Sequence, residues 1–517
     1  MFSIDFTPSN EAKRLRRAIT HKYGNATLVV SFIVLVFIAV RAVSLGRLPR
    51  PLQKPFPLFL SVSLSAFVLA LLSVLETHDD YLYLTKRLGR VAVSAMPALY
   101  FLSLRPSPIP RESYLRLLPL HIWLARIIIF LSTLHGVLYI SYWAQVGNLA
   151  KIFEWTNLLG VLVALGFSLT LIVSLRTFRR RNHELFFKTH YLFAWACVPI
   201  LAYHAQPQIW LIVFYLALFL VGQLAQRHVF FQVVTLSVRH ISPRMDVVTL
   251  PRNLFPKYFS PGAHVRIAPT HRMSRLWFLA ASHPYTIASL ASDEESVRLI
   301  VKPGKRFQLS DDDKCIIYGP YPSVIYDEFA DREQTAQRSR RIVVITGGVG
   351  ISFAAPIVTS LRRTRSNVKL LWAVRSKEDI NLLKILGLGD VDVFISPEAV
   401  SEIEDTFLPE TGELSDGKSL STFEEESVEL SSNLSNEDLH YVSSSNNFIK
   451  HRNINVIYKR MNIEEELRAF RDSFDAGLGS DSSSMYVISC GSRKLVSECS
   501  RWGKKLGAKV IEELYEI

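Results

Sequence analysis

Cysteine is scarce in this chain of 517 residues. The four cysteines are Cys197, Cys315, Cys490 and Cys499, and they form no CxxC pair. Their spacing fits neither a disulfide framework nor a cysteine-ligated metal site. A part of the chain that folds without disulfides is expected to face the reducing cytosol.

The sequence also predicts neither a cleavable signal peptide nor a nucleic-acid-binding surface. The first 24 residues are polar and charged, and the apolar run after them is too long for the core of a signal peptide. The net charge is +13, but the basic residues are not interleaved with aromatic ones as on a nucleic-acid-binding surface. Many of them instead flank apolar segments, as membrane topology requires. We therefore expect the lipid bilayer as a partner and no nucleic acid.

Long apolar runs fill the first half of the chain. Runs long enough to cross a bilayer lie at 25–44, 55–75, 91–104, 117–142, 156–175, 187–203 and 208–225. The run at 91–104 is short, so the sequence predicts six or seven membrane-spanning helices. From residue 231 onward the composition is that of a soluble protein.

The loops between these runs predict the orientation. The loop 176–188 is strongly basic and is expected in the cytoplasm, whereas the loop 143–155 holds one lysine and one glutamate and is expected outside. Residues 226–517 then lie in the cytoplasm. Counting back through seven spans puts the N-terminus outside, although four basic residues within 13–17 favour the inside. Either the first run does not span the membrane or a weaker run is miscounted.

Four histidines in the apolar half form two pairs with the same spacing. His121 and His135 lie in one predicted span, His190 and His204 lie in another, and each pair is 14 residues apart. On a helix, 14 residues return a side chain to within about 40° of its starting face and about 21 Å further along the axis. One span separates the two helices, so they run in the same direction. His121 then meets His190, and His135 meets His204.

Two imidazoles that face each other at each of two depths suit the iron of two b-type haems. Ionisable residues in membrane spans are rare and usually functional. The alternatives are histidines that bond to neighbouring helices and a proton relay. With the orientation above, the His121/His190 site lies on the inner side. Arg126, between the two histidines of the first helix, is expected either to pair with a haem propionate or to reach the membrane interface.

After residue 231 the sequence changes to short β-rich stretches separated by turn residues, which predicts a small antiparallel barrel. Within it lies HPYTIAS at 283–289, about 60 residues before a glycine-rich turn. With the paired histidines before it, this motif resembles the ferric reductase and NADPH oxidase superfamily over roughly residues 85–517. The resemblance implies that the barrel binds FAD. The implied contacts are those of His283, Pro284, Tyr285 and Thr286 with the isoalloxazine and of Ser289 with the phosphates.

The glycine-rich turn lies in RIVVITGGVGISFAAPIVTSLRR at 341–363. An apolar strand leads into Gly347, Gly348 and Gly350, and a helix follows, so the backbone and the helix N-terminus can approach a pyrophosphate. The turn reads GGxG rather than GxGxxG, and it is similar to the nucleotide motif of the superfamily. The next strand ends at Arg375, and a basic residue there favours the 2′-phosphate of NADPH.

The strand YVISCG near the end of the chain finishes at Cys490 and Gly491. The resemblance implies that Cys490 approaches the nicotinamide, which makes it the predicted catalytic residue. Ser492 stands where the family has a proline, and Tyr515 is expected over the flavin.

The predicted fold is a multi-span α-helical membrane domain of six or seven helices, followed by an antiparallel β-barrel FAD domain and an α/β NADPH-binding domain. The expected boundaries are 1–84 for an N-terminal region with the first spans, 85–225 for the haem domain, 231–340 for the FAD-binding barrel and 341–517 for the nucleotide domain. Within the last domain, a Ser/Glu/Asp/Asn-rich stretch at about 397–450 predicts a disordered insertion.

Together these features predict electron transfer across a membrane, from cytosolic NADPH through FAD and two bis-histidine b haems. The expected acceptor is a ferric or cupric chelate, as for a metalloreductase of iron or copper homeostasis, and dioxygen is the alternative, as for an NADPH oxidase. A non-catalytic regulatory or channel-like relative stays open because the turns GPYP and CGS depart from the family. A membrane-tethered flavin reductase without haem is a further alternative. The expected location is the plasma membrane or the endoplasmic reticulum, with the FAD and NADPH domains in the cytosol.

Overall fold

The computed structural model describes most of the chain. The described residues are 9–44, 58–77, 80–109, 114–229, 231–269, 282–293, 295–303, 309–323, 341–363, 367–396, 453–475 and 485–514. They form two compact units, one from residues 1–231 with 268–282 and the other from 232–267 with 283–517. The predicted insertion at 397–450 and Tyr515 lie outside the described residues.

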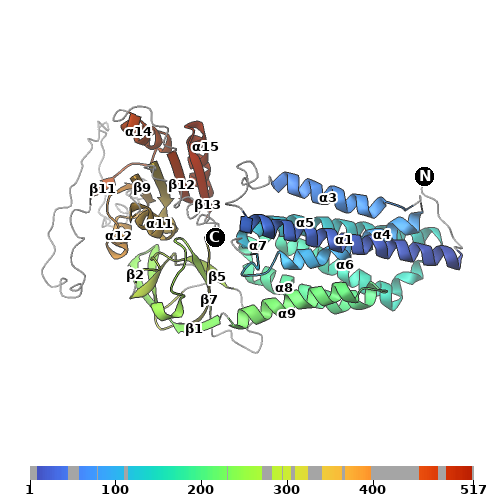
Figure 1. The fold of residues 1–517 in the computed structure, drawn as a ribbon. Coiled ribbons are helices and arrows are strands. Elements are labelled where there is room, and N and C mark those ends of the chain that lie inside the picture. Colours follow the sequence, from blue (N-terminus) through green and yellow to red (C-terminus); the bar gives the residue numbers. More distant parts are fainter. Residues whose placement is uncertain are drawn as a thin grey trace, which may run out of the picture. The chain divides into compact units, whose positions relative to one another are not determined.

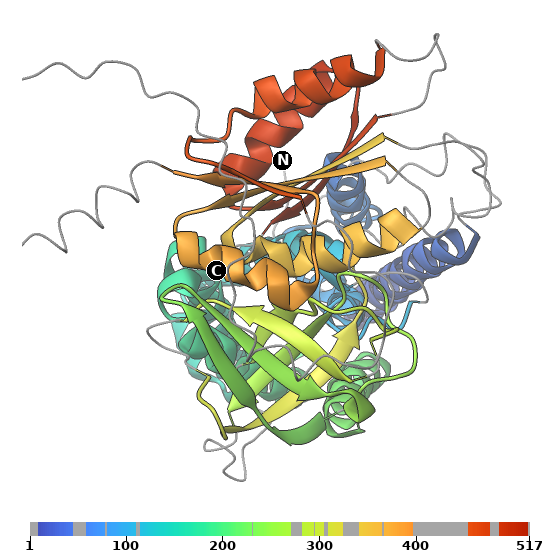
Figure 2. The same cartoon turned by 90° about the vertical axis from the view of Figure 1, so that its left-hand side faces the viewer.

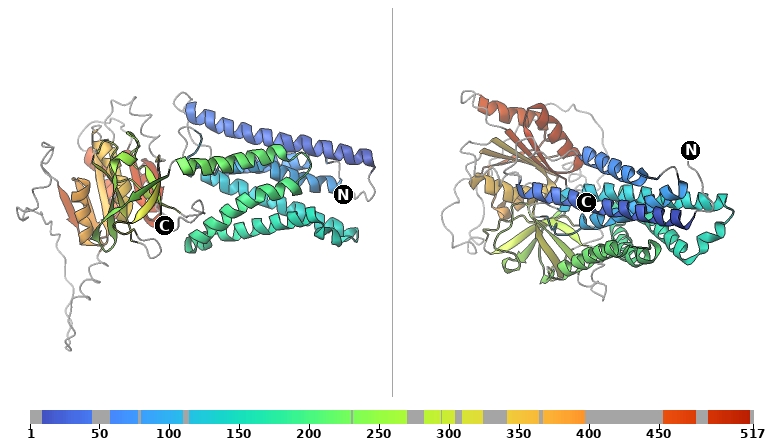
Figure 3. Two further views of the ribbon diagram at one scale, coloured as in Figure 1. Left: turned by 90° about the horizontal axis from the view of Figure 1, so that it is seen from below. Right: turned by 45° about the vertical axis from the view of Figure 1, so that its right-hand side comes forward.

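The first unit is a bundle of helices that run alongside one another (Figure 1 and the left panel of Figure 3). Its long helices are α1 (Asn10–Ser44), α3 (Leu58–Val74), α4 (Tyr81–Phe101), α5 (Tyr114–Gln145), α6 (Trp155–Ser174), α8 (His183–His204) and α9 (Trp210–Val229), with the short helices η2 (Leu149–Phe153) and α7 (Arg176–Arg181) between them. In the described part, five of them, α1, α5, α6, α8 and α9, are long and apolar enough to cross a membrane. Helix α3 is apolar but only 17 residues long.

Helix α4 differs from its neighbours because it lies inside the bundle. Of its 21 residues, 16 are buried, and it packs against α1, α3, α5 and α9. Lys86, Arg87 and Arg90 lie in its first half, which is why only 91–104 reads as apolar in the sequence. Hydropathy presumes contact with lipid, whereas Arg87 and Arg90 are buried and donate hydrogen bonds to backbone carbonyls of the bundle. The span predicted at 91–104 is therefore corrected to a helix over Tyr81–Phe101.

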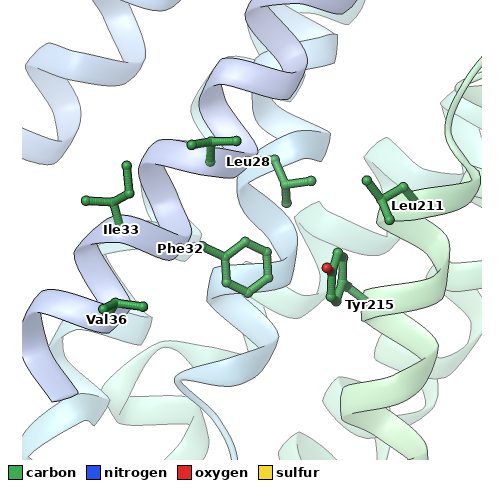
Figure 4. A pocket seen from close by; sticks show the side chains of 7 residues that line it. Leu28, Phe32, Ile33, Val36, Leu211 and Tyr215 are labelled. Atoms are coloured by element: carbon green, nitrogen blue, oxygen red, sulfur yellow. The ribbon is translucent and has the colours of Figure 1, made fainter. Parts of the chain in front are cut away.

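A groove of about 480 Å³ opens between α1 and α9 (Figure 4). It is lined by Leu28, Val29, Phe32, Ile33, Val36, Leu211 and Tyr215. Every lining side chain except Tyr215 is a hydrocarbon, so the groove offers no metal ligand and no charge for a nucleotide. It is not the candidate redox site.

The second unit begins with two sheets whose strand orders are β1-β7-β4-β5 and β2-β3-β6. The strands are β1 (Phe231–Thr235), β2 (Ser237–Ser242), β3 (Met245–Pro251), β4 (His264–Pro269), β5 (His283–Thr286), β6 (Ser296–Val301) and β7 (Lys314–Tyr321). The pairs β2–β3, β3–β6 and β4–β5 are antiparallel. The two sheets share one core that includes Val248 and Val265, and a bridge between Ile287 and Leu299 joins them beyond β5. This arrangement is consistent with the predicted barrel.

The rest of the second unit is a parallel sheet of six strands in the order β11-β10-β9-β8-β12-β13. Its elements are β8 (Arg341–Gly347), η6 (Gly348–Gly350), α11 (Ile351–Arg363), β9 (Asn367–Val374), η7 (Lys377–Ile380), α12 (Asn381–Leu386), β10 (Val391–Ile395), β11 (Ile454–Ile457), α14 (Ile463–Asp475), β12 (Met485–Gly491), α15 (Arg493–Lys505) and β13 (Lys509–Leu514). Helices α11 and α12 cover one face and α14 and α15 the other (Figure 2). The chain order reverses between β8 and β12, and open α/β sheets bind ligands at the carboxyl edge beside such a point.

Candidate functional site

The structure brings the four histidines together as two facing pairs. The ring centres of His121 on α5 and His190 on α8 are 6.3 Å apart, and those of His135 and His204 are 6.4 Å apart. The equal 14-residue spacing produces both pairs because α5 and α8 run in the same direction. We call His121/His190 the inner pair and His135/His204 the outer pair, after the orientation expected from the loops.

These separations fit one metal ion held between each pair of rings. A metal–imidazole bond is about 2 Å long and the nitrogen lies about 1.1 Å from the ring centre, so two rings on opposite sides of one metal have centres roughly 6.3 Å apart. Haem iron needs only two protein ligands because the macrocycle supplies the rest. The geometry therefore fits a haem at each pair.

Backbone carbonyls orient three of the four rings. Nδ1 lies 3.0 Å from the Leu99 oxygen in His121, 2.7 Å from the Thr85 oxygen in His135 and 2.7 Å from the Thr156 oxygen in His204. A carbonyl oxygen only accepts hydrogen bonds, so Nδ1 donates in each case and Nε2 keeps its lone pair for a metal. In His190, Nδ1 is buried with no partner among the described residues.

Two glycines within helices make room for the outer pair. A Cβ on Gly89 of α4 would lie 2.8 Å from Nδ1 and Cε1 of His135. A Cβ on Gly160 of α6 would likewise lie 2.9 Å from Nε2 of His204 and closer still to its Cε1. A side chain at either position would collide with an imidazole. Sequence reasoning misses both residues, although an isolated glycine inside a helical pattern is a usable signal for close packing.

Arg126 lies on α5 between His121 and His135. Its side chain is exposed, and its guanidinium lies 4.5 Å from the ring centre of Trp123, which is exposed on the same helix. Pairing with a haem propionate and reach to the membrane interface therefore both stay predictions for Arg126. An aromatic side chain does extend from the outer pair, since the Tyr139 ring lies 5.0 Å from that of His135.

The predicted flavin motif forms β5, which ends the strand order of its sheet. Tyr285 lies opposite Val265 and Thr286 opposite His264 in the antiparallel pair with β4. Pro284 is exposed, as suits a residue that lacks an N–H on a strand at a sheet edge. Burial raises the pKa of the Tyr285 phenol, which therefore stays neutral and can donate a hydrogen bond. An edge strand that presents an aromatic ring and a hydroxyl fits a flavin ring.

Ser289 lies just beyond β5 and is buried. Its hydroxyl oxygen accepts a hydrogen bond from the backbone N–H of Arg298 at 3.1 Å. The hydroxyl hydrogen remains available to donate to a phosphate, so its expected role stays a prediction.

The predicted nucleotide residues meet at the carboxyl edge of the parallel sheet. Gly347 ends β8, and Cys490 and Gly491 end the adjacent strand β12. Gly348 has a φ of +55°, a conformation that glycine adopts without strain. A Cβ on Gly350 would lie 3.0 Å from the carbonyl oxygen of Cys490. Bare backbone at this turn fits a pyrophosphate, which binds to main-chain N–H groups at such positions.

Cys490 is fully buried beside this turn. Burial raises the pKa of its thiol well above the usual value, so the sulfur is protonated and is not a thiolate nucleophile. Its neighbour in register on the adjacent strand β13 is Glu513. Burial raises the pKa of the Glu513 carboxyl to about 7. A neutral thiol can pack against an uncharged ring but does not attack it.

Arg375 follows β9 directly and is exposed at the same edge. The nearby acid Glu378 is bonded to the hydroxyl of Ser376, which begins η7. Asp379 in turn accepts a hydrogen bond of 2.6 Å from Ser242 of β2, so this edge is bonded to the barrel. Arg375 and Lys377 are both exposed here, and the contact of Arg375 with a phosphate stays a prediction.

Ser492, which replaces the proline of the family motif, begins helix α15. Its hydroxyl oxygen accepts a hydrogen bond from the Leu495 N–H at 3.4 Å as the helix N-cap. Serine and proline both favour helix starts, so the CGS turn keeps the same local structure.

Three family models match successive parts of the chain. The ferric reductase like transmembrane component matches residues 88–201, an FAD-binding domain matches 230–311, and the ferric reductase NAD binding domain matches 339–502. With the fold above, they define a transmembrane oxidoreductase that has FAD- and NAD-binding domains.

The chain belongs to the ferric reductase and NADPH oxidase superfamily and is similar to fungal proteins named as metalloreductases. It is 35% identical to "Probable metalloreductase AIM14" of Yarrowia lipolytica over 384 residues, 72% of this chain and 71% of that one. It is 30% identical to the protein of the same name in Meyerozyma guilliermondii over 510 residues, 96% and 97% of the two chains. A ferredoxin NADP+ reductase from Neisseria gonorrhoeae with bound FAD and NADP matches 55% of this chain and 98% of its own, with 12% identity and a TM-score of only 0.36.

Proposed function

We propose that this protein transfers electrons from NADPH, through FAD and two b-type haems, to a metal ion on the other side of the membrane. The observation that carries the proposal is the geometry of the two histidine pairs. Ring centres 6.3 and 6.4 Å apart, with Nδ1 bonded to carbonyls in three of the four rings, leave Nε2 for a metal at two depths of the bundle.

A bound flavin supplies the conversion of a two-electron hydride donor into a source of single electrons, which haem iron requires. The chain's own contribution is positioning. The glycine turn at 347–350 and the end of β12 hold the dinucleotide, and β5 presents Tyr285 and Thr286 to the flavin ring. Buried, protonated Cys490 keeps charge and water away from the place where the nicotinamide is expected.

The choice of NADPH rests on Arg375. It is exposed directly after β9, where a basic residue favours the 2′-phosphate of NADPH. Glu378, the acid that would repel this phosphate, is bonded to Ser376.

Two imidazoles at each iron would leave no open position, so the acceptor is expected to receive its electron at the edge of the outer site. The relatives are named as metalloreductases, and a ferric or cupric chelate is the acceptor that we propose. The basic loop 176–188 supports a cytosolic location of the flavin and nucleotide domains, and the bundle is expected in the plasma membrane or the endoplasmic reticulum.

Reduced-minus-oxidised absorption spectra of membranes that contain the protein test this function. With NADPH as the reductant, the expected result is a b-type haem signal that His190→Ala removes or halves. His228→Ala, in the last turn of α9, is the control and should keep the full signal. Haem that dithionite reduces but NADPH does not would contradict the electron path, and the absence of haem would overturn the proposal.

A further inference from the structure

The end of the bundle that holds the outer pair is rich in basic residues. Residues 10–24 of α1 include five lysines and arginines and one acid, and the first ten residues of α4 include three basic residues and no acid. These segments lie side by side, because Arg16 pairs with Asp80 at the start of α4. The outer pair lies at the same level, because His135 bonds to the carbonyl of Thr85.

Four of these eight basic residues have structural partners. Arg16 pairs with Asp80 and Lys22 with Glu76, Arg87 donates to the carbonyls of Leu72 and Leu75 at 3.3 Å, and Arg90 donates to those of Pro207 and Gln208 at 3.1 and 2.7 Å. They hold α1, α3 and the loop before α9 against α4. These four side chains therefore serve contacts within the bundle.

The other four, Lys13, Arg14, Arg17 and Lys86, make no ion pair within the part of the chain that the structure describes, and we call them the outer basic cluster. All four side chains are exposed. Lys86 is within electrostatic range of the basic residues Lys13, Arg16 and Arg17 and of the acid Asp80. Lys13 and Arg17 thus repel Lys86, and a bound anion would relieve the repulsion.

The cluster lies close to the outer pair. Lys86 directly follows Thr85, whose carbonyl orients His135. Tyr139, whose ring is 5.0 Å from that of His135, is within electrostatic range of Arg16. An anion held at the cluster would therefore be near the site from which electrons leave the bundle.

Membrane topology alone does not explain the cluster. Basic residues favour the cytoplasmic side, whereas the outer pair and the cluster lie at the end of the bundle away from α9's last residue, Val229, which leads to the cytosolic domains.

We propose that the outer basic cluster attracts and docks an anionic electron acceptor, namely a ferric or cupric ion in a carboxylate chelate. This inference rests on the proposed function and specifies its substrate class. Dioxygen carries no charge and would gain nothing from the cluster.

The test uses the complete protein in nanodiscs of neutral phosphatidylcholine, with NADPH as the donor and each acceptor below saturation. The acceptors are anionic ferric EDTA, cationic hexaammineruthenium(III) and neutral dioxygen. For ferric EDTA, kcat/KM should fall as ionic strength rises, because salt screens the attraction. It should rise for the ruthenium complex and stay constant for dioxygen.

The triple variant Lys13→Gln, Arg14→Gln and Arg17→Gln removes charge but no residue of the histidine sites. It should lower kcat/KM for ferric EDTA by about tenfold at low ionic strength and leave NADPH-driven haem reduction intact. The matched control is the triple variant Arg501→Gln, Lys504→Gln and Lys505→Gln, which removes the same charge from exposed positions in the last turns of α15. The control should change none of the three rates.

An equal loss with all three acceptors, or no loss with ferric EDTA, would overturn the inference. A charge dependence that appears only when anionic lipid is added would assign the cluster to lipid headgroups and also overturn it. These outcomes differ from a failure of the proposed function, in which NADPH would not reduce haem in the unaltered protein.

Discussion

Gly89 and Gly160 set the positions of the outer imidazoles although neither can bind a metal. Each stands where a Cβ would meet the ring of His135 or His204. Close packing of this kind is sensitive to a single added carbon, and overpacking costs about 1–3 kcal/mol. The histidines alone therefore do not define the site.

Gly89→Ala should lower the haem content of the protein, because the new methyl group would displace His135 from its position opposite His204. We expect about half of the haem to be lost, which the ratio of haem to flavin in purified protein measures. Gly136→Ala is the control, since a Cβ at Gly136 on α5 would meet nothing within 4 Å. Two haems per chain with unchanged spectra in Gly89→Ala would contradict this account of the outer site.

For single residues, the sequence predicts the four histidines but not the carbonyls and glycines that surround their rings. The equal spacing of His121/His135 and His190/His204 follows from helix periodicity within single segments. The carbonyls of Leu99, Thr85 and Thr156 and the two glycines come from α4 and α6. Their contacts with the histidines depend on how separate helices pack. The residue pattern of a single segment does not contain that information.

Helix α4 shows that sequence patterns also fail to predict a whole element when its surroundings are protein. Hydropathy predicts a short span at 91–104, yet the helix begins at Tyr81, because Arg87 and Arg90 in its first half have protein partners rather than lipid. The α/β nucleotide domain was easier to predict. Its central strand β8 is a continuous apolar run, which is typical of a strand that is covered on both faces.

The edge strand β13 carries a titratable group, Glu513, that links the stability of the folded protein to pH. Glu513 is half-buried, pairs in register with Cys490, and has a pKa raised by burial from 4.5 to about 7. Because the folded state favours the protonated form, this contribution to stability is complete below pH 4.5 and is lost as the pH rises through about 7. The loss should lower the unfolding temperature by roughly 2–4 °C per kcal/mol.

Glu513→Gln should therefore flatten the dependence of stability on pH between 5 and 7, as measured by heat-induced release of flavin fluorescence. Glu512→Gln, the exposed neighbour on the same strand, is the control and should keep the slope of the unaltered protein. Identical slopes in all three proteins would show that Glu513 does not carry this dependence.

For the whole molecule, the fold class and the family are confirmed, and the direction of electron flow is a proposal. The sequence predicts a helical membrane half followed by a β-barrel and an α/β domain. The described residues form a helical bundle, two small sheets that are consistent with the barrel, and an α/β domain whose sheet is parallel. The side of the membrane on which each end of the bundle lies follows from loop charge alone. The basic start of α1 opposes that assignment unless it serves another purpose, and docking of an anionic acceptor supplies one.

The most direct test of the central claim is electron transfer across a sealed bilayer. Proteoliposomes that enclose membrane-impermeant ferric EDTA would receive NADPH from outside, and trapped ferrous iron would be measured over time. The account predicts reduction of the enclosed iron in vesicles whose nucleotide domain faces outward, and its loss in His190→Ala. Reduction of ferric EDTA only on the side where NADPH is added would contradict transfer through the two histidine pairs.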